Sequence, residues 1–195
     1  MKTMRTLRLP LFLATILLPT LAHAHVGVGS TSGFLPGIAH PFSGLDHLCA
    51  MMAVGLWAAQ RGGRALWIVP LSFISLMICG AALGIAGVTI PFVEQGIVAS
   101  VLLLGVLIAA AVRLPVAASA LLVGLFALWH GHAHGTEMPL AASGMAYAAG
   151  FVVATAMLHA AGIGLGIAMQ RLASSTWVRA AGGAIACCGL YMLVA

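Results

Sequence analysis

The chain has 195 residues, of which 63% are apolar and 6% are charged, and its mean hydropathy is +1.16. These values exclude a soluble globular domain and indicate an integral membrane protein, whose partner is the lipid bilayer. Eight basic and three acidic residues leave no basic patch for binding nucleic acid. Walker and dinucleotide-binding motifs are absent from the sequence, so we expect no ATP, NAD or other resident cofactor.

The first segment carries the signals of secretion. Three basic residues among the first eight precede a short apolar run, residues 9–21, which ends in Ala22-His23-Ala24. A basic start, a short apolar stretch and a small-x-small triplet are typical of a cleavable signal peptide. We therefore predict that residues 1–24 are removed and that the mature chain starts at His25, outside the cytoplasm. The alternative is an uncleaved extra helix.

The remaining residues, 25–195, are predicted to form one all-α domain, a polytopic membrane protein with six transmembrane helices. Spans of roughly 20 apolar residues match the thickness of the hydrocarbon core, and the short connections leave no room for a second domain. Two Gly-x-x-x-Gly pairs, Gly80/Gly84 and Gly162/Gly166, are interpreted as ordinary close helix packing. The six apolar spans are Ser43–Ala59, Ala65–Leu83, Glu94–Val112, Val116–Trp129, Leu140–Met169 and Val178–Val194.

The positions of the arginines predict the orientation of these spans. If the mature N-terminus is outside, the connections after the first, third and fifth spans face the cytoplasm. Those connections hold every basic residue of the mature chain, namely Arg61, Arg64, Arg113, Arg171 and Arg179, as the positive-inside rule requires. We therefore predict a protein of the bacterial inner membrane with both mature termini in the periplasm.

Histidines are the unusual feature, because seven of the eight lie in residues 25–195. His25 opens the mature chain, where its imidazole and the α-amine can chelate together. His40 and His47 flank the start of the first span in the string His40-Pro41-Phe42-Ser43-Gly44-Leu45-Asp46-His47. We expect Pro41 to hold His40 in an extended conformation above that span.

Asp46 is the residue of this first cluster whose transfer into the bilayer requires the most free energy. An ionised aspartate inside a bilayer costs about 2.5–3.5 kcal/mol and is tolerated with a partner or a water-filled cavity. A bound cation would offset that cost, and His47 stands beside it in the sequence. For Asp46 alone, a capping-box contact with Ser43 is the alternative.

A second cluster, His130, His132 and His134, ends the fourth span, with Glu137 three residues later. If the helix persists, His130 and His134 stand at i and i+4 on one face, a spacing that lets two imidazoles bind one metal, and His132 points elsewhere. If the intervening glycines unwind the helix, the tract is a flexible collecting loop.

His159 lies well inside the fifth span, with Thr155 as its polar neighbour. A lone histidine there is commonly a hydrogen-bonded structural residue, but intramembrane ionisable residues are functional by default. We expect Asp46, His47 and His159 to meet at a deep site, and the second cluster to lie nearer the water.

Imidazole nitrogens with one or two carboxylates suit Ni²⁺, Co²⁺, Zn²⁺ or Cu²⁺, so the residues alone predict a transporter of divalent transition-metal ions. An intramembrane zinc-dependent hydrolase, in which Asp46 or Ser143 assists a water, is the alternative. A metal sensor or passive binding protein is a third possibility. The candidate metal ligands are Asp46, His47, His159, His40, His130, His132, His134, Glu137 and His25.

Three strings together resemble the HupE/UreJ family: residues 40–47 quoted above, His130-Gly131-His132-Ala133-His134-Gly135-Thr136-Glu137, and Ala154-Thr155-Ala156 with Leu158-His159 and Gly162. The resemblance extends over the whole chain. It implies a six-helix secondary carrier, not an enzyme, for Ni²⁺ and in some members Co²⁺. It also implies service to hydrogenase or urease assembly, and thus an indirect link to the maturation proteins of those enzymes.

Overall fold

The computed structural model describes residues 33–138, 142–172 and 174–194. These residues form seven helices and no strand, which confirms the predicted all-α class. The signal peptide and His25 lie outside the described residues. The helices are α2 (Phe34–Ser43), α3 (Leu45–Arg61), α4 (Ala65–Ile85), α5 (Val93–Ala109), α6 (Val116–Glu137), α7 (Ala142–Leu172) and α8 (Ser175–Val194).

Several of these helices fit a membrane. In the described residues, α4, α6, α7 and α8 are long and apolar enough to cross a bilayer, and α2 with α3 makes a fifth candidate. Helix α5 is apolar but has only 17 residues. Large apolar side chains such as Trp67, Leu121 and Leu172 are exposed on the outside of the bundle. An exterior of this kind is energetically acceptable against lipid.

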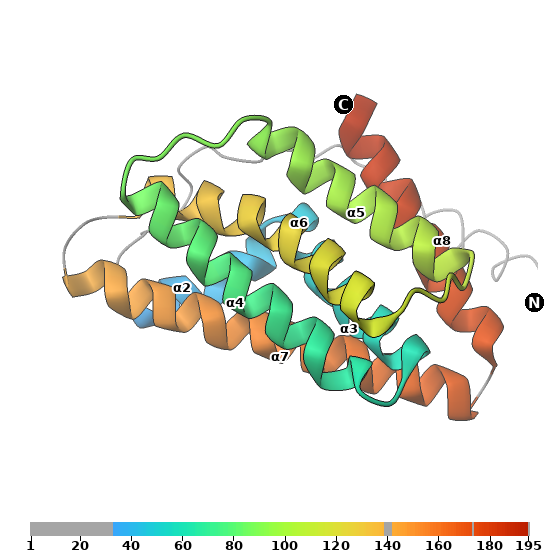
Figure 1. Cartoon of the computed structure of the whole chain (residues 1–195). Helices are drawn as coiled ribbons and strands as arrows, with labels where there is room; N and C mark the ends of the chain where they lie inside the picture. The colour runs from blue at the N-terminus through green and yellow to red at the C-terminus, as the bar shows by residue number, and fades with distance from the viewer. Residues whose placement is uncertain (1–32, 139–141, 173, 195) are drawn as a thin grey trace, which may run out of the picture.

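Glycines set the distances between paired helices. Helices α4 and α6 run side by side (Figure 1), and a Cβ added to Gly131 of α6 would overlap the backbone of α4 at Met77. Gly80 of α4 lies equally close to α6, and Gly162 of α7 approaches Gly55 of α3. The predicted packing role of the Gly-x-x-x-Gly pairs is confirmed.

The predicted first span, Ser43–Ala59, corresponds to the continuous helix α3, but the sequence does not predict the short helix α2 that precedes it. Helix α2 ends at Ser43, Gly44 is extended (φ −99°, ψ 124°), and α3 then starts at an angle of 86° to α2. The prediction that Pro41 holds His40 extended is wrong, because both residues are helical. Pro41 lies in the last turn of α2, where its missing N–H removes only one helical hydrogen bond before the helix ends.

The arginine-bearing helix ends meet at the end of the bundle opposite to the histidines. Arg61, in the last turn of α3, donates a hydrogen bond to the carbonyl oxygen of Leu114 at 2.5 Å. Arg179, in the first turns of α8, donates to the carbonyl oxygen of Ala109 at 2.8 Å. The bundle therefore has an arginine end and a histidine end, and the latter holds the start of α3 and the end of α6.

Candidate metal site

Four histidines from three helices gather where the break between α2 and α3 faces the end of α6. The ring of His47 lies 4.4 Å from the ring of His134 and 4.8 Å from that of His130, measured between centroids. His40, on α2, lies 4.7 Å from His134. The side chains of His47, His130 and His134 are all buried. We call these four residues the histidine cluster.

Asp46 fixes the orientation of His47. One carboxylate oxygen of Asp46, Oδ1, accepts the backbone N–H of His47 at 2.8 Å and lies 2.9 Å from His47 Nδ1. When Nδ1 carries the proton, the lone pair of a neutral ring is on Nε2, so a carboxylate at Nδ1 turns Nε2 into the ligand. The capping-box alternative is wrong, because the Ser43 hydroxyl donates to the carbonyl oxygen of His40 instead.

Ser100 of α5 fixes His130 in the same way. Its hydroxyl donates to the carbonyl oxygen of Ile97 at 2.6 Å and stands 2.8 Å from His130 Nε2. Because the serine proton is already used, Ser100 accepts a hydrogen bond from Nε2–H. The lone pair of His130 is then on Nδ1. Ser100 is not among the residues that the sequence predicts for the site; its only signal is a polar side chain within an apolar helix.

His47 and His134 point their Nε2 atoms at each other across 2.5 Å. Two bare lone pairs would repel at this separation, and two N–H groups would clash, so the contact requires a single proton between the two nitrogens. For a divalent cation to bind both Nε2 atoms, that proton would have to leave the gap, in a neutral pair by moving to His134 Nδ1, and the two rings would have to move apart to make room for metal–nitrogen bonds of about 2.0–2.1 Å. This pair is the geometric centre of the histidine cluster.

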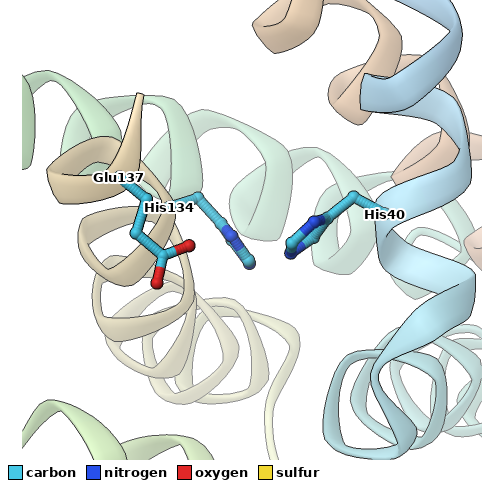
Figure 2. A group of neighbouring side chains, drawn as sticks. All are labelled: His40, His134 and Glu137. Carbon is cyan, nitrogen blue, oxygen red and sulfur yellow. The ribbon is translucent and has the colours of Figure 1, made fainter. Parts of the chain in front are cut away.

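Glu137 adds a carboxylate on one side of the cluster. One potential ligand atom from each of His40, His134 and Glu137 lies within 4.8 Å of the others. Figure 2 shows the two rings facing each other from α2 and α6, with the carboxylate beside His134. The site thus combines imidazole nitrogen donors with one carboxylate, a set that suits first-row transition metals.

Aromatic and aliphatic side chains form the walls of the cluster. The ring of Phe151 on α7 lies 4.4 Å from that of His134, and Tyr147 one turn earlier lies 5.9 Å from His40. A cavity of about 230 Å³ between α4, α6 and α7 is lined almost wholly by apolar groups and reaches His134. These walls exclude water and so strengthen the attraction between the ligands and a cation.

His159 is not part of the cluster. Its backbone lies beside Gly55, eight residues and therefore about 12 Å further along α3 than His47. Its ring is buried against Phe73, whose centroid is 5.1 Å away, and neither ring nitrogen has a hydrogen-bond partner. Thr155 donates to the carbonyl oxygen of Phe151, so it does not hold His159. The expected meeting of His159 with Asp46 and His47 is wrong.

The placement of the second cluster also differs from expectation. Helix α6 continues to Glu137 instead of unwinding, and His130, His132 and His134 are buried rather than near water. His130 and His134 share the face that meets His47, as the i, i+4 spacing predicts. His132 points elsewhere, with its Nε2 at 2.7 Å from the carbonyl oxygen of Val88.

Comparisons with known proteins agree with one another. The model of the family described as HupE / UreJ protein matches residues 13–192. A curated relative, Protein HupE of Rhizobium leguminosarum bv. viciae, is 48% identical over 182 residues, which are 93% of this chain and 95% of the relative. No solved structure matches the chain.

Proposed function

The chain belongs to the HupE / UreJ family, and we propose that it carries Ni²⁺, with Co²⁺ as a second ion, across the bacterial inner membrane. The family is associated with transport of nickel or cobalt for hydrogenase or urease, and its members are transporters rather than enzymes. We therefore favour transport over hydrolysis of a substrate. The delivered ion would supply hydrogenase or urease assembly.

The single observation that carries this proposal is the pair of Nε2 atoms of His47 and His134, 2.5 Å apart inside an apolar bundle. Two further imidazoles and the Glu137 carboxylate lie around it. A carrier must bind its ion and also release it, so a few neutral ligands suit the task better than a cage of charges. Asp46 then acts mainly by positioning His47.

The proposed topology has six spans. It takes α2 with α3 as one broken span and α5 as a short one, together with α4, α6, α7 and α8. The histidine end faces the periplasm and the arginine end faces the cytoplasm, in keeping with the positive-inside rule. A broken helix whose unpaired end lines an ion site at membrane depth is a recurring feature of secondary transporters.

The decisive experiment is uptake of radiolabelled Ni²⁺ into vesicles containing the purified chain. We expect saturable uptake that Co²⁺ inhibits, and loss of uptake in His47→Ala and in His134→Ala. Leu121→Ala is the matched control, because Leu121 is on the same helix as His134 but is 77% exposed on the outer face. Equal uptake by the wild-type chain and both histidine variants would contradict the proposed site. No uptake by the wild-type chain would contradict the proposed function.

A further inference from the structure

The apolar cavity that reaches His134 opens on the outer surface of the bundle. Its volume is about 230 Å³, and its floor is buried, with Met77 and Phe151 only 3% and 5% exposed. Its rim includes side chains on the outside of α4 and α7, such as Ile78 and Met145, which are 50% and 73% exposed. The cavity is therefore a pocket that leads from the exterior of the bundle to one wall of the histidine cluster.

Unequal packing around α4 creates this pocket. Helix α4 packs closely against α6, whereas its contact with α7 is much smaller. Gly131 and Gly135 account for the close side, because both lie against the backbone of α4. On the other side, the lining includes Ala82 of α4 and Ala148 of α7, and these short side chains leave the space between the two helices unfilled.

The surroundings of the opening favour an apolar occupant. Helices α4, α6 and α7 are each long and apolar enough to cross a membrane, so the exposed rim faces hydrocarbon. The lining is almost wholly apolar, and because a buried water needs about two to four polar partners, water does not fill the pocket. An empty pocket would deprive the atoms of its lining of their dispersion contacts. The bilayer itself supplies apolar chains at the rim.

The size of the pocket distinguishes between apolar occupants. An apolar cavity of about 150 Å³ can hold a benzene molecule, so a pocket of about 230 Å³ has room for several methylene groups of one chain. One turn of a helix, about 10 Å across and 5.4 Å long, occupies roughly 400 Å³. A helix from a second copy of the chain would therefore rest on the rim and leave the buried floor uncovered.

We propose that a membrane phospholipid inserts one acyl chain between α4 and α7 into this pocket. The end of the chain lies against Met77 and Phe151, and Phe151 in turn contacts the ring of His134. The acyl chain thus completes the apolar wall of the histidine cluster, and a bound lipid becomes part of the folded protein. This lipid site requires that the bundle lies in a bilayer, and it does not depend on which ion the protein carries.

The test uses the purified full-length chain in nanodiscs whose phospholipid carries a photoactivatable diazirine near the end of one acyl chain. After illumination, mass spectrometry of peptides locates the lipid adducts. We expect an adduct on Met77 or Phe151, which surrounding lipid does not reach because both side chains are buried. Met51 is the internal control, because it is also buried but does not line the pocket. Adducts on exposed side chains alone, or equal labelling of Met51, would overturn the proposal.

Variants that fill the pocket supply the second measurement. Ala148→Phe on α7 and Ala82→Phe on α4 each place a phenyl ring in the space of the acyl chain, and each should abolish the adduct on the buried floor. Ala149→Phe is the matched control and should keep that adduct, because Ala149 is exposed and does not line the pocket. Persistence of the adduct in both filled variants would overturn the lipid site. Because labelling needs neither metal nor flux, its result does not depend on whether the wild-type chain transports nickel.

Discussion

The short contact between His47 and His134 has a consequence for protons. One proton fills the space between the two Nε2 atoms, 2.5 Å apart, and a bound cation must replace it. We expect Ni²⁺ binding to release about one proton for each ion where both Nδ1 atoms are also protonated and the pair is positively charged, and close to none where both rings are neutral, because the shared proton then moves to His134 Nδ1. Titration calorimetry in buffers of different ionisation enthalpy measures this number directly, and His47→Ala should abolish the release.

The same competition predicts a pH dependence. Only a neutral imidazole binds metal, and the ordinary pKa of histidine is about 6.5, so affinity should fall as the pH drops through that value. We expect a loss of about tenfold or more between pH 7.5 and 5.5, roughly one unit on either side of that pKa. Binding measured on the purified protein avoids any effect of a proton gradient. A flat profile would contradict ligation by histidine.

Gly44 makes room for the pair formed by Asp46 and His47. A Cβ at this position would lie 2.6 Å from Asp46 Oδ1 and 3.3 Å from His47 Nδ1. The backbone angles of Gly44 suit any residue, so Gly44→Ala should fold normally but push the carboxylate off His47. We expect Ni²⁺ affinity to fall by about 10–100-fold, as on loss of other supporting carboxylates.

Titration calorimetry checks the Gly44→Ala effect, with Gly164→Ala as the control. A Cβ at Gly164 of α7 meets no atom within 4 Å, so this variant should bind Ni²⁺ like the wild-type chain. Unchanged affinity in Gly44→Ala would mean that Asp46 does not position His47.

The sequence largely predicts which residues form the cluster, but it does not predict how deeply their side chains are buried. Imidazoles and an aspartate stand out in apolar spans because burying them is costly, and this identifies His40, Asp46 and His47. The hydropathy pattern ends the fourth span at Trp129, so it predicts that the histidines after it lie near water. In the structure, α6 continues to Glu137, and the neighbouring helices cover His130 and His134.

At the scale of helices, the glycines of the His-Gly-His-Ala-His-Gly tract have a packing role that the sequence leaves open. Gly131 and Gly135 are possible points of unwinding by sequence, but each lies against the backbone of α4, at Met77 and Ala81. The register between helices depends on such close contacts between distant segments. The distance of His159 from the cluster has the same origin. Gly55 of α3 packs against α7 beside His159, and a single sequence does not reveal that contact.

The contact between Gly131 and α4 predicts a stability effect. Gly131→Ala would place a Cβ inside the backbone of α4 and force α4 and α6 apart. We expect a loss of about 1–3 kcal/mol in the free energy of unfolding, as for other overpacked sites, together with weaker Ni²⁺ binding. Thermal unfolding of the purified protein in detergent, followed by circular dichroism, measures the change.

Gly183→Ala on α8 is the matched control for the α4–α6 contact. A Cβ at Gly183 meets no atom within 4 Å, and alanine is favoured over glycine within a helix by up to about 1 kcal/mol. Gly183→Ala should therefore unfold at the same temperature as the wild-type chain or slightly above it. Equal stability of Gly131→Ala and Gly183→Ala would show that α4 and α6 tolerate a wider separation.

For the whole molecule, the two ends of the bundle predict its orientation. Arg61 and Arg179 belong to the end opposite to the histidine cluster, so the positive-inside rule puts the cluster on the periplasmic side. An alkaline phosphatase fused after Ala195 should be active, and a green fluorescent protein at the same place should stay dark. The reverse pattern would mean that the histidine cluster faces the cytoplasm, and it would contradict the proposed orientation.

The shortness of α5 matters for the membrane around the protein. Its 17 residues span about 26 Å at 1.5 Å per residue, against about 30 Å for an average hydrocarbon core. Its neighbour α6, with 22 residues, reaches about 33 Å. In the proposed topology, in which α5 crosses the membrane, the bilayer beside α5 would therefore be thinner so that both ends of the helix reach the headgroup region. Ser100, whose hydroxyl contacts His130, is on α5, so a thinner bilayer at α5 would bring the headgroup region closer to the proposed metal site. Nickel uptake should consequently be sensitive to acyl-chain length, and faster in thin bilayers than in thick ones.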